Sequence, residues 1–99
     1  MLRIDRSLVD EHRVVLILEG RIAGAWADLL ERECEALIER GLRVELDLSE
    51  VVYVARAGVE ALRRLGRMRV GVTGCSPLIA AVLTQEGIPF TFIARKEIR

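Results

Sequence analysis

The stretch that decides the fold runs from Arg43 to Leu65 and reads RVELDLSEVVYVARAGVEALRRL. Its first part, residues 43–49, alternates between apolar and polar or charged side chains, which predicts a strand with one buried and one solvent-facing side. Residues 51–54, three valines and a tyrosine, indicate the end of a buried strand or the loop beyond it. From Gly58 onward, apolar residues at helical spacing predict a helix.

The start of that helix is unusual. Ala55, Arg56 and Ala57 stand where helices usually begin with Ser, Thr, Asp or Asn, whose side-chain oxygens cap free N–H groups. A cation here also lies near the positive end of the helix dipole. Two interpretations of Arg56 stay open: a tolerated surface substitution, or a cation that docks an acidic or phosphorylated partner. The docking interpretation is favoured by the other charged residues on the same helical stripe, which are Glu60, Arg63 and Arg67.

Strands and helices alternate on both sides of this stretch. Strand patterns cover residues 2–9, 14–18, 68–73 and 90–94, and helical patterns run from Trp26 to Gly41 and from Ser76 to Gly87. This order predicts parallel pairing with right-handed crossovers. Because polar residues occupy one face of three strands, we expect the helices to cover only the other face. The predicted fold is α/β, with a mostly parallel five-stranded sheet in sequential order, an antiparallel first strand and helices on one face.

Composition narrows the class of protein. The 99 residues form a single domain, residues 1–99, and 52% hydrophobic with 30% charged residues indicates a soluble globular protein. A net charge of zero argues against nucleic acid as a partner. The apolar runs are too short to span a bilayer and the first residues are no signal peptide, so we expect a cytoplasmic protein without membrane insertion.

Residue types that carry chemistry are sparse. Cys34 and Cys75 lack the spacing of metal ligands, and no Ser-His-carboxylate pattern or glycine-rich phosphate loop is present. We therefore expect no metal, no cofactor and no enzymatic activity. Cys75 lies next to the Ser76 cap, where a thiol pKa can fall, but we do not expect a redox role for it.

Several segments, taken in order, resemble the STAS domain, the fold of bacterial anti-sigma-factor antagonists and of the cytoplasmic tail of sulphate transporters. They are LILEGRI at 16–22, LRVELDLSEVVYV at 42–54, Gly58 with Val59 and Leu62, and VGVTGCSPLIAAVLTQEGI at 70–88. The resemblance covers roughly Val14 to Phe92. It supports the α/β fold predicted above.

The resemblance also implies a phosphorylation switch that this chain lacks. In the family, Asp-Ser-x-Gly precedes the helix glycine, and a partner kinase phosphorylates the serine. Aligned on Gly58, Ala55 replaces the aspartate and Arg56 replaces the serine, while a second family aspartate is absent near Ile22 and Ala23. A guanidinium cannot accept a phosphoryl group, so we expect no phosphorylation at this position.

The family resemblance implies a non-catalytic protein-interaction module, an anti-sigma-factor-antagonist-like regulator in bacterial signalling. The alternative is a STAS accessory subunit of an ABC-type lipid transporter. The partner would be an anti-sigma factor or switch kinase in the first case and an ABC ATPase subunit in the second, and a weak homodimer also stays open. Binding is expected at loops after the carboxyl ends of parallel strands. The predicted partner-binding residues are Arg21, Ile22, Ala23, Tyr53, Ala55, Arg56, Ala57, Gly58, Glu60, Arg63, Arg67, Gly74, Cys75 and Ser76.

Overall fold

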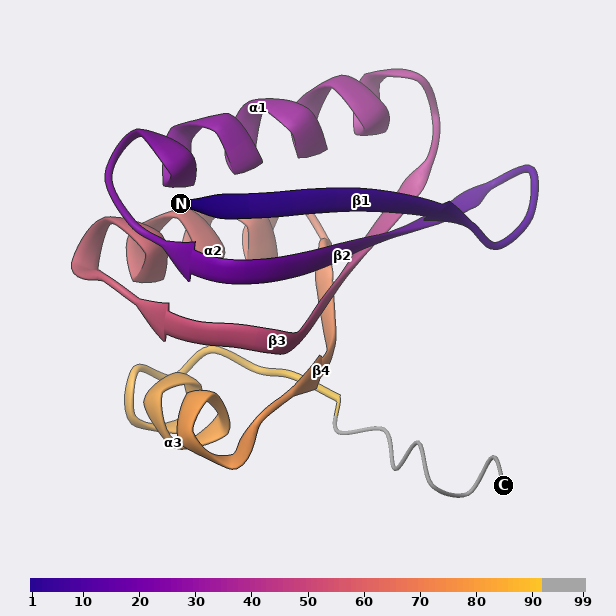
Figure 1. The fold of residues 1–99 in the computed structure, drawn as a ribbon. Helices are drawn as coiled ribbons and strands as arrows, with labels where there is room; N and C mark the ends of the chain where they lie inside the picture. The colour runs from indigo at the N-terminus through magenta and orange to yellow at the C-terminus, as the bar shows by residue number, and fades with distance from the viewer. Residues whose placement is uncertain (92–99) are drawn as a thin grey trace.

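The computed structural model of the chain describes residues 1–91. Its elements are β1 (Leu2–Leu8), β2 (Arg13–Ile22), α1 (Ala25–Glu39), β3 (Arg43–Val54), α2 (Arg56–Arg67), β4 (Gly71–Cys75) and α3 (Pro77–Gln85). The strands lie in the order β1-β2-β3-β4, with β1 antiparallel to β2 and the other pairs parallel (Figure 1). The α/β class, the sequential order and the antiparallel first strand are thereby confirmed.

The sheet within residues 1–91 has four strands, and the prediction of five was wrong. Most of the expected strand 90–94 lies outside the described residues, and neither Phe90 nor Thr91 belongs to a strand. The Thr91 amide donates one hydrogen bond to the Val72 carbonyl oxygen, at 2.8 Å. The chain thus reaches the free side of β4 without forming a ladder with it in the described part.

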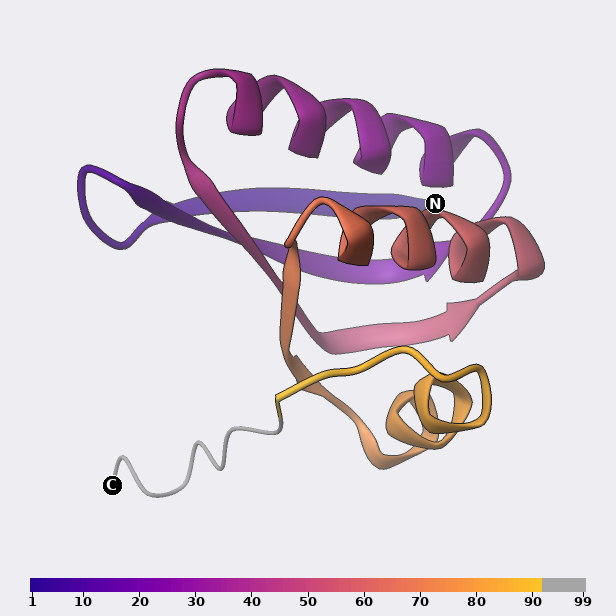
Figure 2. The same ribbon diagram turned by 180° about the vertical axis from the view of Figure 1, so that it is seen from behind.

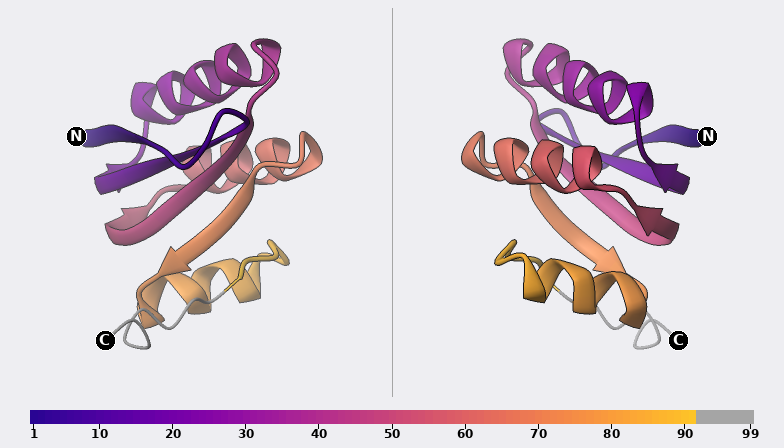
Figure 3. Two further views of the ribbon diagram at one scale, coloured as in Figure 1. Left: turned by 90° about the vertical axis from the view of Figure 1, so that its right-hand side faces the viewer. Right: turned by 90° about the vertical axis from the view of Figure 1, so that its left-hand side faces the viewer.

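The sheet has one buried and one open face. Val44, Leu46 and Leu48 of β3 are buried, whereas Arg43 is exposed and Glu45 is half-buried on the opposite face. α1 and α2 lie next to each other over the buried face (Figure 2), and α3 joins them at the β4 end of the sheet (Figure 3). The alternation in the sequence therefore predicted correctly which side of β3 faces the core.

Three strand boundaries differ by three or more residues from the prediction, and the first is the end of β2, which lies at Ile22 and not at Leu18. β3 continues to Val54 because its last residues pair with Glu19–Ile22 of β2, so Tyr53 lies on a strand and not in a loop. β4 starts at Gly71, three residues later than predicted, because α2 continues to Arg67 and closes with two hydrogen bonds that involve Arg69 and Val70. Alternating apolar residues at 68, 70 and 72 do not distinguish a helix end from a strand start.

Candidate partner-binding site

The parallel strands bring three helix starts to one edge of the sheet. β2, β3 and β4 lead into α1, α2 and α3 respectively, and all three junctions lie at the carboxyl ends of these strands (Figure 1). The amide of Ala55 donates to the Ile22 carbonyl oxygen, at 3.0 Å, and so holds the start of α2 against the end of β2. We call this region the carboxyl edge and define it as residues 21–24, 52–57 and 76–78.

Gly58 sets how closely α2 approaches the sheet. A Cβ atom at this position would lie 2.9 Å from Ile22 Cγ2 and 2.9 Å from Val54 Cγ1, and closer still to the Ile22 carbonyl oxygen. Real Cβ atoms do not tolerate such contacts, so the packing of α2 on β2 requires a glycine here. The buried Gly58 therefore positions the site and presents no side chain to a partner.

The first turn of α2 has no side-chain cap. Ala55 occupies the N-cap position, with φ −79° and ψ 173°, and Arg56 is the first helical residue. The Asp-Ser-x-Gly pattern of the family would place its aspartate at this cap and its serine at the first helical position. The Arg56 side chain, which the sequence resemblance aligns with that serine, is 69% exposed and reaches solvent.

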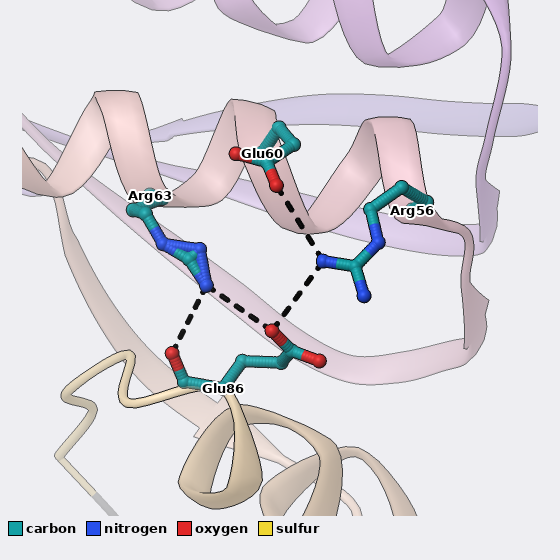
Figure 4. Close-up of polar contacts among 4 residues, drawn as sticks. All are labelled: Arg56, Glu60, Arg63 and Glu86. Carbon is teal, nitrogen blue, oxygen red and sulfur yellow. Dashed lines mark hydrogen bonds and ion pairs between the residues drawn. The ribbon is translucent and has the colours of Figure 1, made fainter.

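Arg56 belongs to a network of four charged side chains (Figure 4). Its Nη1 atom lies 3.5 Å from Glu60 Oε2 and 3.5 Å from Glu86 Oε1. About two turns further along α2, Arg63 Nη2 donates at 3.1 Å to both the carbonyl oxygen and Oε1 of Glu86. Two arginines thus face two glutamates, and the network is neutral as a whole.

This network shows that the predicted stripe of Arg56, Arg63 and Arg67 is not a continuous row of unpaired cations. Arg56 and Arg63 are compensated within the chain, whereas Arg67 forms no ion pair among residues 1–91. Arg64, beside the stripe, forms two hydrogen bonds with Glu31 of α1, at 2.8 and 3.0 Å. These bonds lower the pKa of the Glu31 carboxyl and tie α2 to α1. Most of the positive charge of α2 therefore stabilises its packing against its neighbours.

The structure divides the other predicted residues into supporting and accessible ones. Buried positions, which can shape the site but offer little surface, are Ile22, Gly58, Gly74 and Cys75. Half-buried positions are Ala23, Ala55, Glu60, Arg63 and Ser76. Exposed positions are Arg21, Tyr53, Arg56, Ala57 and Arg67. Gly74 and Cys75 lie in β4, so the expected loop at 74–76 reduces to Ser76.

The exposed part of the edge is more apolar than predicted. Val52, which the sequence analysis did not select, is 62% exposed, and Tyr53 is 50% exposed. The Arg21 guanidinium lies 6.0 Å from the centre of the Tyr53 ring. A groove of about 400 Å³ runs between Arg21 and Val52 and is also lined by Met1, Arg3, Glu19 and Gly20. The sequence held a signal for the exposure of Val52: it follows Val51 directly, and successive strand residues point to opposite faces of a sheet.

Neither cysteine is activated. Burial raises the pKa of the Cys34 thiol to about 12, and burial also raises the pKa of Cys75 despite its place near the start of α3. Within residues 1–91, no cluster of three or more His, Cys, Asp or Glu side chains could hold a metal ion. No helix in that range is long and apolar enough to cross a membrane.

Comparison with known proteins identifies the fold. No protein-family model and no curated protein sequence matches the chain. Among solved structures, it matches the unphosphorylated anti-sigma factor antagonist SpoIIAA with a TM-score of 0.78 and 17% identity, over 97% of this chain and 92% of that one. It matches an anti-sigma factor antagonist from Mycobacterium paratuberculosis with a TM-score of 0.79 and 16% identity, over 99% and 92% of the two chains.

A third structure has the same fold at a greater distance. An uncharacterized protein of the DUF3478 family from Shewanella loihica, described as SpoIIAA-like, matches with a TM-score of 0.59 and 13% identity, over 92% of this chain and 82% of that one. At these identities the likeness shows the architecture. The chain has the SpoIIAA-like fold that the sequence resemblance implied.

Proposed function

We propose that this chain is a non-catalytic protein-interaction module, a regulator of the anti-sigma-factor-antagonist type that works without phosphorylation at residue 56. The observation that carries the proposal is the position of Arg56. It is the first residue of α2, exposed at the carboxyl edge of a SpoIIAA-like fold, and the sequence resemblance aligns it with the serine of the family motif. A regulator of this type acts in the bacterial cytoplasm on an anti-sigma factor or switch kinase.

The surface around Arg56 supports a protein partner. Val52 and Tyr53 together expose an aliphatic and an aromatic side chain beside the Arg21 cation. Protein interfaces are enriched in aromatic residues and arginine, and lysine, glutamate and aspartate are depleted at their centres. The edge therefore offers an apolar contact area with the Arg21 cation at its border.

The carboxyl edge is tested with a pair of exposed valines. Val52 is 62% exposed at this edge, and Val9 is 47% exposed in the hairpin turn between β1 and β2, at the opposite end of these strands. Titration calorimetry would measure binding to the anti-sigma factor encoded in the same genome. Val52→Asp should weaken binding by about tenfold or more, as expected for an apolar contact near an interface centre. Val9→Asp should bind as the wild type does.

Two results would contradict the proposal. If both variants bound with the same affinity as the wild type, the binding surface would lie outside the carboxyl edge. Binding to an ABC ATPase subunit, with none to any anti-sigma factor of that genome, would replace the proposed function by the transporter alternative.

A further inference from the structure

Glu86 connects the start of α2 with the end of α3. It is the C-cap residue of α3, and its carboxylate lies between Arg56 and Arg63 (Figure 4). Arg63 also donates to the Glu86 carbonyl oxygen, one of the groups that a helix end leaves without an intrahelical partner. The Glu86 side chain is only 25% exposed, which limits screening by solvent.

We infer that the charge of residue 56 is coupled through Glu86 to the end of α3. The carboxylates of Glu60 and Glu86 favour a cation over an anion at this position, against the preference of the helix dipole. We call Arg56, Glu60, Arg63 and Glu86 the α2–α3 clip. The inference concerns the free chain, and it does not depend on which partner binds.

The physical reason lies in the two carboxylates that face residue 56. A cation at Arg56 is attracted by Glu60 and Glu86, each 3.5 Å from its guanidinium. A phosphoserine, which carries a charge of about −1.5 to −2, or a glutamate would be repelled by both. The departure from the family switch therefore involves more than the substitution at residue 56, because the neighbouring acids also oppose a phosphate there.

Repulsion at residue 56 would reach the segment that follows α3. Displacement of the Glu86 carboxylate would remove one of the two hydrogen-bond acceptors of Arg63. The other acceptor is the Glu86 carbonyl oxygen at the C-cap of α3. The same helix end is closed by the amides of Gly87 and Ile88, which donate to Thr84 and Leu83 at 3.1 and 2.9 Å. These amides are the natural reporters of the coupling.

Amide hydrogen exchange of the free chain tests the inference. In Arg56→Glu, the amides of Gly87 and Ile88 should exchange about two- to fivefold faster than in the neutral variant Arg56→Gln, the scale expected for partly exposed ion pairs. The matched control is the end of α1, where the amides of Gly41 and Leu42 form the same pattern of bonds. Their exchange should not change.

A second background separates coupling from a general loss of stability. In Glu86→Gln, the difference between the glutamate and glutamine variants of residue 56 should disappear at Gly87 and Ile88. Equal exchange of Arg56→Glu and Arg56→Gln in the wild-type background would overturn the inference. A difference that persists undiminished in Glu86→Gln, or that appears equally at Gly41, would overturn it as well.

Discussion

The helices α2 and α3 both follow a parallel strand at the carboxyl edge, but they begin in different ways. Ser76 caps α3 by accepting a hydrogen bond from the Ile79 amide at 3.3 Å, and a proline occupies the first turn. Ala55 has almost the same backbone conformation as Ser76 but offers no side-chain acceptor, and Arg56 follows it. The start of α3 is stabilised locally, whereas the start of α2 is not.

The ends of the two helices show the same contrast. α3 closes with Gly87 at φ 73°, and α2 closes with Arg69 at φ 69°, a conformation that costs a residue with a side chain more than it costs glycine. In compensation, α2 is held by its neighbours through buried positions such as Leu62 and through ion pairs from Arg63 and Arg64. Local rules that a helix violates tend to mark functional positions, so the comparison points to α2.

The largest expected effect tests whether packing holds α2. Gly58→Ala should destabilise the chain by about 2–3 kcal/mol, because the new methyl group would overlap with Ile22 and Val54. Gly66 lies in the same helix with open space around it, so Gly66→Ala should stabilise the chain by about 0.5–1 kcal/mol. Urea unfolding of both variants measures the difference. If Gly58→Ala were neutral, close packing on β2 could not account for the position of α2.

The second prediction exchanges the caps. Ser76→Ala should cost about 1 kcal/mol, and Ala55→Ser should gain a similar amount or slightly less, because both positions have the extended backbone of an N-cap. Thermal and urea melts of the two variants provide the measurement. If Ala55→Ser destabilised the chain, the backbone amides in the first turn of α2 would already have other hydrogen-bond acceptors.

The smallest effect concerns the helix end. Arg69→Gly should stabilise the chain by about 0.5–1 kcal/mol, since glycine relieves a positive φ but loses more freedom on folding. Gly87→Ala, at the equivalent position of α3, should instead destabilise the chain. If urea melts showed that both variants change the free energy of unfolding in the same direction, the contrast between the two helix ends would be contradicted.

Much of the fold could be predicted because its signals are local. Alternation along β3 identified the buried face, and Gly41 and Gly87 marked two helix ends with positive φ. The ion pairs that Glu86 forms with Arg56 and Arg63 could not be predicted, because Arg63 and Glu86 are 23 residues apart and meet only when α2 and α3 pack. The exposure of Val52 had only a partial signal in the adjacent valines 51 and 52, because it also depends on how far β3 extends beside β2.

The candidate site was predicted by place more than by residue. Parallel topology predicted binding at the carboxyl ends of the strands, and the alignment on Gly58 matched Arg56 with the family serine; both stay predictions. The sequence offered no way to tell that Cys75 is buried and that its pKa is raised, since proximity to a helix start suggests the reverse. The burial of Cys75 is set by the sheet and helices that pack around it, and the residues next to it in sequence do not encode it.

One measurement tests the central claim most directly: affinity for the anti-sigma factor of the same genome, before and after incubation of the chain with a switch kinase and ATP. Titration calorimetry gives the affinity, and mass spectrometry of the same sample locates any phosphate. We predict one unchanged affinity and no phosphate, because Arg56 occupies the switch position. Stoichiometric phosphate on Ser49 or Ser76, together with loss of binding, would contradict the claim that this module works without a phosphorylation switch.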